Sequence, residues 1–343
     1  MRERLDLQRV DPTYHLVFDN GSQLALTSDM KSLQEQLESF QPGSFQGLLR
    51  YLEEGDRHYR LSLDKLVNRD FRKASDFFNF QNLPLLFRLK PLIQHYRNMS
   101  AYFDDPRLKT AFSFQDVYMG LSPFEAPSTF SLMPYTELAH GVWYPRGGMY
   151  SVVETLTDLA RESGVEFIFN SAVERIDTTA KHARGVLLTD GTRLDAEAVL
   201  ANADLPYVYQ KLLPQDGMAK ALSRKRFSCS VISFFWGVDK PYDAIGPHTL
   251  FLADDYRENF ESIIRDLDLP ANPSIYIHAP ARLGDEAGVA HVAEPNVEGG
   301  LAVLGGGVET APGALGVEED EGEEARAILD ETTGAVGPAE ADH

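Results

Sequence analysis

The sequence GVWYPRGGMY, residues 141–150, leads from an apolar stretch through two glycines towards a helix. We predict this helix from Met149 to Glu162, because apolar residues recur on one side of it and Gly164 can close it. Two extended stretches follow at 165–169 and 172–176. The alternation of helix and strand indicates an α/β fold.

Short strands continue towards the C-terminus. Asp190-Gly191 separates apolar runs at 185–188 and 192–194, which is the pattern of a β-hairpin. Further strands are predicted at 197–202, 228–238 and 274–278.

The N-terminal part is predicted to contain a β-hairpin followed by helices. A hairpin is predicted at 14–26, with its turn at Asn20-Gly21. Ser28 and Asp29 can cap the helix that follows, and Pro42-Gly43 can end it. Residues 45–66 have the apolar spacing of one or two amphipathic helices. We therefore expect a mixed sheet combined with a helical layer.

Charge is distributed unevenly along the 343 residues. The segment 284–343 contains 15 of the 52 acidic residues and one of the 32 basic residues, Arg326, and so carries −14 of the net charge of −20. It also lacks aromatic residues and contains Gly305-Gly306-Gly307. We predict that it is a disordered acidic tail. The remaining chain is only mildly acidic, so a nucleic-acid partner is not expected.

The cysteine content and the apolar runs bear on localisation. Cys229 is the only cysteine, which excludes an intramolecular disulfide and fits a reducing, intracellular compartment. No apolar leader follows Met1, and no run reaches the length of a membrane span. We expect a protein that can touch a membrane without crossing it. A homo-oligomer is possible.

Residues 71–103 combine aromatic residues with interspersed cations. Such a segment is either an apolar surface that lies in a membrane interface or a buried helical subdomain with snorkelling basic residues. The membrane alternative assigns contacts to Phe77, Phe78 and Phe87. The cations are Arg72, Lys73, Arg88, Lys90 and Arg97.

Several motifs in register identify a family resemblance. GVWYPRGGMY, FIFNSAVERI at 167–176, ANAD at 201–204 and SIYIHAPAR at 274–282 occur in the order and spacing of the bacterial and fungal phytoene desaturases, which the chain resembles over about residues 1–282. The resemblance implies a partial, Rossmann-like FAD-binding domain and a substrate domain with a mixed sheet and helices. It divides the chain into a substrate- and membrane-facing region (1–141), a partial FAD-binding region (142–210), a continuation of the substrate domain (211–283) and the tail (284–343).

The resemblance also implies which residues contact FAD. Gly147 and Gly148 lack side chains, so their backbone can approach a planar ring or a phosphate. The neighbouring Tyr144, Pro145 and Arg146 belong to the same predicted cofactor contact. A turn that needs glycine for steric reasons alone is the alternative.

Three further cofactor contacts lie downstream. Val173 is expected beside the adenine, which it contacts through its backbone. Asn202 and Asp204 follow a predicted short strand, where α/β folds place ligands. Asp204 can equally cap a helix. No metal ligands are predicted.

The resemblance implies removal of hydrogen from a polyene hydrocarbon such as phytoene, with hydride passing to the flavin and NAD or a quinone as the terminal acceptor. Asp105 and Lys109 match the family's acidic and basic positions, with the acidic position falling at Asp105 or on Pro106. A capped helix start with a surface ion pair is an equal alternative.

No G-x-G-x-x-G motif opens an apolar helix, and the resemblance ends after residue 283. We therefore expect an incomplete family member that is inactive as it stands. Two other functions stay open. One is a non-catalytic isoprenoid- or lipid-binding fragment, and the other is a carotenoid isomerase or another isoprenoid-oxidising flavoenzyme.

Overall fold

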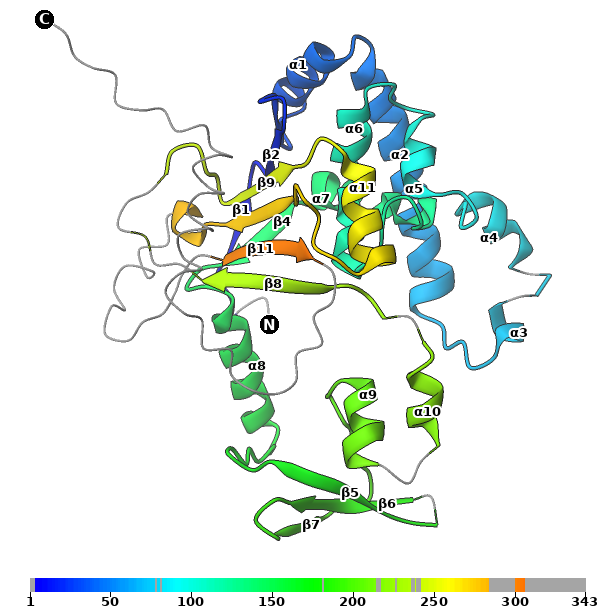
Figure 1. The fold of residues 1–343 in the computed structure, drawn as a ribbon, viewed down its shortest axis with the longest axis vertical. Helices are drawn as coiled ribbons and strands as arrows, with labels where there is room; N and C mark the ends of the chain where they lie inside the picture. Colours follow the sequence, from blue (N-terminus) through cyan, green and yellow to red (C-terminus); the bar gives the residue numbers. More distant parts are fainter. Residues whose placement is uncertain are drawn as a thin grey trace, which may run out of the picture. The chain divides into compact units, whose positions relative to one another are not determined.

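Figure 1 shows the fold in a computed structural model. The chain forms two compact units. Unit 1 comprises Met1–Val153 and Ser228–His343, and unit 2 comprises Glu154–Phe227. The residues that the structure describes are 4–77, 79–80, 82–180, 182–213, 217–225, 227–235, 238, 242–283 and 300–305.

A six-stranded sheet forms the framework of unit 1, in the order β3-β2-β9-β10-β11-β8. Strands β2 and β9 are parallel and the other neighbours are antiparallel, so the mixed sheet predicted from the sequence is confirmed. The strands are β2 (Tyr14–Phe18), β3 (Gln23–Leu26), β8 (Ser230–Phe235), β9 (His248–Leu252), β10 (Ile275–His278) and β11 (Gly300–Gly305).

The N-terminal hairpin has its predicted turn. Strands β2 and β3 pair with Tyr14 opposite Leu26, and the Asn20 side chain accepts a hydrogen bond from the backbone N–H of Ser22 at 3.0 Å. Strand β2 then pairs with β9, which is more than 200 residues away in the sequence. The hairpin is thereby joined to the C-terminal part of unit 1.

Helices α1 (Met30–Phe40) and α2 (Ser44–Ser62) begin the helical layer. Asp29 caps α1 by accepting hydrogen bonds from the backbone N–H groups of Lys31 and Ser32, whereas the Ser28 hydroxyl donates to Asp11. Leu33 and Leu37 of α1 and Leu48 and Tyr51 of α2 are fully buried. They anchor the main core at the spacing that the sequence predicts.

The other helical elements of unit 1 are mostly short. They are η1 (Leu63–Val67), α3 (Ala74–Phe77), α4 (Leu83–Arg88), α5 (His95–Met99), α6 (Pro106–Ala111), η2 (Phe114–Met119), η3 (Ser128–Ser131), α7 (Leu132–His140), α11 (Tyr256–Glu261), η5 (Ser262–Asp266) and η6 (Pro280–Leu283). Helix α7 packs on α2.

The aromatic segment 71–103 divides between core and surface. Met99 and Phe103 are buried in the main core, whereas Phe80, Phe87 and Leu92 are 94%, 77% and 87% exposed. Part of the segment is therefore buried, as the core alternative predicts, and contact of the exposed part with a membrane stays a prediction. Phe78 and the side chain of Phe77 lie outside the described residues.

The predicted flavin-side turn follows a second, two-stranded sheet of unit 1. Strand β1 (Leu7–Val10) pairs antiparallel with β4 (Val142–Pro145), which places Gln8 opposite Tyr144. Helix α8 (Tyr150–Glu162) begins after the turn and contains the boundary between the units. Gly164, with φ +84°, closes α8 as predicted.

Unit 2 contains an antiparallel sheet of β5 (Val173–Thr179), β6 (His182–Leu188) and β7 (Arg193–Asp195). The hairpin at Asp190-Gly191 is confirmed, since β6 and β7 pair on either side of it. The helical elements are α9 (Leu205–Tyr207), η4 (Val208–Leu212) and α10 (Met218–Leu222). Leu212 and Val208 pack with Ile176 in a small core.

Two strand predictions in unit 2 are wrong. Residues 165–169 and 197–202 form no strand in the structure. Extended residues make a strand only where a neighbouring chain pairs with their N–H and C=O groups, and no described strand pairs with either run. In the described part of 142–210, consequently, no parallel Rossmann-type strand pair occurs.

The prediction of a wholly disordered tail is wrong for residues 300–305. These residues form β11, which pairs antiparallel with β10 and β8. The sequence GLAVLG lies between two strands whose edges each supply backbone hydrogen-bonding groups, and this pairing outweighs its high glycine content. The rest of 284–343 lies outside the described residues.

Candidate active site

An apolar cavity of about 330 Å³ lies within unit 1. Its walls come from sheet strands β2, β8, β9 and β10, from η2 and from α11, so residues distant in sequence meet around it. Such a cavity suits a hydrocarbon ligand. It is lined by Tyr14, Phe114, Val117, Tyr118, Val231, Leu250, Leu252, Tyr256, Phe260, Ser274, Ile275 and Tyr276.

Two of the lining tyrosines lead to an acid. The Tyr14 and Tyr118 hydroxyls are hydrogen-bonded at 2.7 Å, and the Tyr118 hydroxyl is 3.0 Å from Oε1 of Glu137 on α7. The other carboxylate oxygen of Glu137 accepts a hydrogen bond from Gln115 at 3.1 Å. A polar chain thus runs from the cavity wall to a carboxylate.

The surroundings of this chain change its protonation equilibria. Burial raises the pKa of Glu137 to about 7, and hydrogen bonds from Gln115 and Tyr118 limit the rise. Burial, together with the Glu137 carboxylate, also raises the pKa of Tyr14 and Tyr118. The phenols are therefore neutral at pH 7, while Glu137 can take up or release a proton.

A row of aromatic rings lies beside the cavity. His248 of β9 is directly opposite His278 of β10 in the sheet register, and this cross-strand pair stacks with ring centroids 4.7 Å apart. His248 Nδ1 lies 2.6 Å from the hydroxyl of Tyr276, a lining residue. His278 Nδ1 donates to the carbonyl of Pro247 at 3.0 Å, which leaves Nε2 as the unprotonated nitrogen.

Tyr144 connects this row to the glycine turn. Its ring centroid lies 5.6 Å from that of His278, which stacks on His248, and His248 stacks in turn on Tyr276. Gly147 and Gly148 follow three and four residues later in the same unit. Aromatic side chains therefore link the cavity wall to the predicted flavin contact.

The glycine turn fits a flavin. Gly147 and Gly148 have φ of +84° and +88°, a conformation that favours glycine. A Cβ on Gly147 would meet no atom within 4 Å, and one on Gly148 would meet only the Tyr144 hydroxyl at 3.9 Å. The backbone is open to an approaching planar ring or phosphate, and Gly147, Gly148 and Tyr144 are the residues that would hold it.

The residues beside the turn are fixed by β1. Pro145 pairs with Leu7, and the Arg146 backbone N–H donates to the carbonyl of Asp6 at 2.8 Å. The Arg146 guanidinium also lies 3.3 Å from the Asp6 carboxylate. Tyr144, Pro145, Arg146, Gly147 and Gly148 are consecutive residues of this turn, and their contact with FAD stays a prediction.

The other predicted cofactor contacts belong to unit 2. Val173 opens β5 opposite Leu188. Asn202 and Asp204 are exposed, and the expectation that they end a strand is wrong, because no strand precedes them. Asp204 occupies the N-cap position of the short helix α9, but its side chain makes no capping hydrogen bond. Their contact with FAD stays a prediction.

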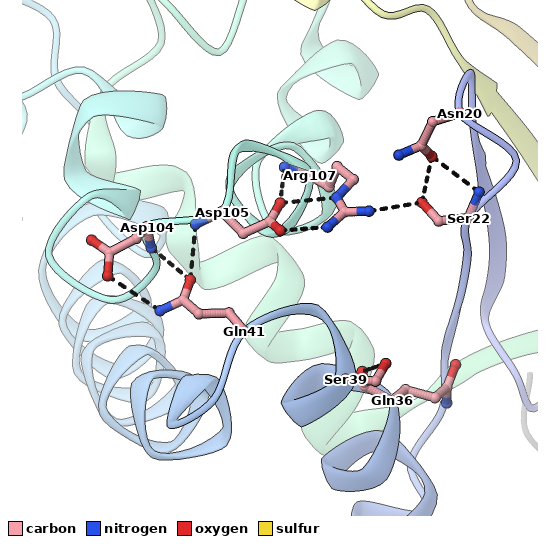
Figure 2. A network of polar contacts seen from close by, with 8 residues as sticks. All are labelled: Asn20, Ser22, Gln36, Ser39, Gln41, Asp104, Asp105 and Arg107. Carbon is pink, nitrogen blue, oxygen red and sulfur yellow. Dashed lines mark hydrogen bonds and ion pairs between the residues drawn. The ribbon is translucent and has the colours of Figure 1, made fainter.

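Asp105 occupies the N-cap position of α6 (Figure 2), and Lys109 lies in the last turn of this short helix. Asp105 caps this helix by accepting a 2.8 Å hydrogen bond from the Arg107 N–H, and its carboxylate pairs with the Arg107 guanidinium at 2.6 Å. The Gln41 amide oxygen accepts the backbone N–H of Asp105 at 2.8 Å. The cation paired with Asp105 is thus Arg107, and the geometry favours the capping alternative.

Sequence reasoning missed the cavity and its polar chain. One signal was present: Tyr276 and His278 lie two residues apart, and so on one face of a predicted strand. The partners that complete the site, Tyr14, Tyr118 and Glu137, come from three other elements, and no local pattern connects them.

Comparison with known proteins identifies the family. Residues 1–262 match the family described as flavin containing amine oxidoreductase. This chain belongs to that family. The family and the relatives below indicate FAD as its cofactor.

The relatives include carotenoid desaturases. Phytoene desaturase of Fusarium fujikuroi is 38% identical over 83% of this chain and 50% of its own length. The zeta-carotene-forming phytoene desaturase of Myxococcus xanthus is 38% identical over 82% and 54%. The 4,4'-diapophytoene desaturase of Staphylococcus aureus is 29% identical over 81% and 56%. The chain thus spans about half the length of these relatives.

A solved structure supports the fold. The crystal structure of an oxidoreductase from Methanosarcina mazei superposes with a TM-score of 0.53 at 13% identity and covers 96% of this chain and 67% of that one. At this identity the likeness extends to the fold and not to the substrate.

Proposed function

We propose that this protein is an FAD-dependent desaturase that introduces double bonds into a carotenoid precursor such as phytoene. The apolar cavity is the observation that carries the proposal. Its walls offer aliphatic and aromatic side chains to a hydrocarbon, and its volume accommodates a segment of an isoprenoid chain. The similarity to phytoene desaturases at 38% identity supports this substrate class.

The residues of the chain would bind and orient the reactants. When bound, FAD supplies the hydride acceptor, which no side chain can provide. Gly147 and Gly148 would give the ring an open backbone surface, and the apolar walls of the cavity would surround part of the hydrocarbon. NAD or a quinone would reoxidise the flavin. The non-catalytic lipid-binding alternative is not favoured, because the relatives are desaturases and dehydrogenases.

The deciding experiment supplies FAD-loaded protein with phytoene in liposomes, anaerobically, and follows the flavin spectrum and the extracted products. We expect the visible flavin absorption to bleach and a product to appear that has lost two hydrogens for each new double bond. A product of unchanged mass would indicate an isomerase. Phytoene bound with neither bleaching nor product would leave lipid binding as the function.

We also propose an intracellular protein that docks peripherally on a membrane, because phytoene is insoluble in water. The support is the exposure of Phe80, Phe87 and Leu92 in one aromatic segment, with the cation Arg88 beside Phe87. Within the described part of the chain, no helix has the length and apolar character needed to span a bilayer.

A further inference from the structure

We propose that Glu137 accepts, through Tyr118 and Tyr14, the proton that the hydrocarbon loses in the cavity. This inference rests on the proposed desaturase function. Desaturation removes two hydrogens from adjacent carbons, and the hydride accounts for only one of them. The second leaves as a proton and needs an acceptor, which an otherwise apolar cavity does not supply.

The geometry offers a connected route for this proton from two lining tyrosines to a carboxylate. Tyr14 and Tyr118 both line the cavity, and their hydroxyls are 2.7 Å apart. Tyr118 continues the route to Glu137 at 3.0 Å. These three groups come from β2, η2 and α7, and each step is within hydrogen-bonding distance.

The direction of the hydrogen bonds follows from the acceptor. An ionised Glu137 only accepts, so the Tyr118 hydroxyl donates to it and in turn accepts the proton of Tyr14. Gln115 donates to the other carboxylate oxygen and holds the carboxylate in place. The resting chain is thereby oriented from the cavity towards Glu137.

The charges around Glu137 leave it able to titrate. Burial raises the pKa of Tyr51 on α2, as it does those of Tyr14 and Tyr118, so the surrounding phenols are neutral near pH 7. Asp116 of η2 is paired with His95 at 2.9 Å. Asp56 of α2, on which α7 packs, is paired with Arg60 and also accepts from Tyr135. A base with a pKa near 7 is well suited to proton transfer.

The step balances along this chain. The C–H bond of the hydrocarbon breaks, its electron pair forms the new double bond, and the proton bonds to the Tyr14 oxygen. Tyr14 passes its own proton to Tyr118, and Tyr118 passes its proton to Oε1 of Glu137. Both tyrosines end neutral and Glu137 ends protonated. Tyr118, the hydrogen-bond partner of Glu137, is 48% exposed, so water beside this pair can then take up the proton.

The test compares Glu137→Gln and Tyr118→Phe with the unchanged protein, all loaded with FAD and supplied with phytoene liposomes. Glutamine keeps the shape and the acceptor for Tyr118 but cannot take up a proton. We expect kcat to fall by about 10²-fold or more in Glu137→Gln, with unchanged phytoene binding and loss of the rate increase between about pH 6 and 8. Glu53 is an exposed glutamate of α2, and Glu53→Gln is the matched control. It should leave kcat and its pH dependence unchanged.

An infrared titration of the protein without substrate gives a second measurement that does not depend on turnover. A carboxylic-acid C=O band should disappear near pH 7 in the unchanged protein and be absent in Glu137→Gln. Titration near pH 4.5, or turnover with an unchanged pH profile in Glu137→Gln, would overturn the inference alone. An unchanged protein that binds phytoene without desaturating it would overturn the proposed function, and this inference with it.

Discussion

His278 and His248 stack across adjacent antiparallel strands, with ring planes 11° apart and centroids 4.7 Å apart. The arrangement disfavours simultaneous protonation of both rings, because two imidazolium ions at this distance repel each other. Burial and the neighbouring His278 lower the pKa of His248 to about 4. The stack therefore makes the cavity wall sensitive to acid.

The first prediction concerns this pH dependence. His248 titrates at about 6.5 when unfolded and at about 4 in the folded chain, so the unfolded state binds more protons between these values. The free energy of unfolding contributed by His248 should therefore decrease as the pH falls from 6.5 to 4. Urea unfolding across this range should show a flatter pH dependence in His248→Phe than in the unchanged protein.

His182→Phe is the control for the acid titration, since His182 is exposed on β6 of the other unit. It should preserve the full pH dependence. Nuclear magnetic resonance of the His248 imidazole provides a direct check. An imidazole that charges near pH 6.5 would contradict the prediction.

The second prediction separates the two roles considered for Asp105. Asp105→Ala removes both the cap of α6 and the ion pair with Arg107, so we expect a loss of about 1 kcal/mol in the free energy of unfolding. Asp105→Asn retains a capping oxygen and should cost less. Desaturation by Asp105→Asn should stay within about threefold of the unchanged rate, because the carboxylate contacts Arg107 and not the cavity lining.

Asp29→Ala is the matched control, because Asp29 caps α1 in the same way and is not a candidate catalytic residue. It should lose a similar free energy of unfolding and keep its rate. A large loss of turnover in Asp105→Asn without a loss of stability would restore the catalytic hypothesis for Asp105 and, with it, for Lys109.

Whether a prediction from the sequence agrees with the structure depends on how far apart in the chain the interacting residues lie. The Asn20-Gly21 turn, the Asp29 cap and the Gly164 helix end depend on neighbouring residues, and each was predicted correctly. Local backbone preference and side-chain hydrogen bonding determine these features, so they can be read from a few adjacent positions.

The errors arise where a distant partner decides the outcome. Residues 165–169 have an apolar, β-prone sequence but pair with no described strand, whereas the glycine-containing 300–305 pairs on both sides. The cavity also depends on distant partners, because Tyr14 and Tyr276 become neighbours only through the register of β2, β9 and β10. Tertiary pairing of this kind leaves no local signal in the sequence.

The third prediction concerns the glycine turn. Gly148→Ala forces a side chain into a conformation with φ +88°, at a cost of about 1–2 kcal/mol, and places a methyl group on the open backbone surface. If the turn receives the flavin, both effects should weaken binding, and we expect FAD affinity to fall by about tenfold or more. Fluorescence of released flavin during dilution measures this directly.

Gly164→Ala is matched to this variant, since Gly164 also has a positive φ of +84° and a Cβ there would meet no atom within 4 Å. It carries the same backbone cost at the C-terminal end of α8 and is not among the predicted flavin contacts. The free energy of unfolding of this variant should fall, whereas its FAD affinity should stay unchanged. Equal losses of FAD affinity in the two variants would show that stability, and not contact, is responsible.

The fourth prediction tests the proposed membrane surface. Phe80, Phe87 and Leu92 are among the most exposed apolar side chains of unit 1, and their transfer into a bilayer interface would remove apolar area from water. Replacing all three with serine should lower the fraction of protein that sediments with liposomes by about tenfold or more. The same variant should keep its helical circular dichroism, because these side chains contribute little to the core.

The matched control replaces Leu200, Leu205 and Phe227 with serine, three side chains of unit 2 that are 97%, 54% and 61% exposed. This variant removes a comparable set of exposed apolar groups without changing the segment around α4. It should sediment with liposomes as the unchanged protein does. Equal losses in the two variants would indicate non-specific adhesion of apolar side chains, and unchanged sedimentation of the first variant would exclude this segment as the docking surface.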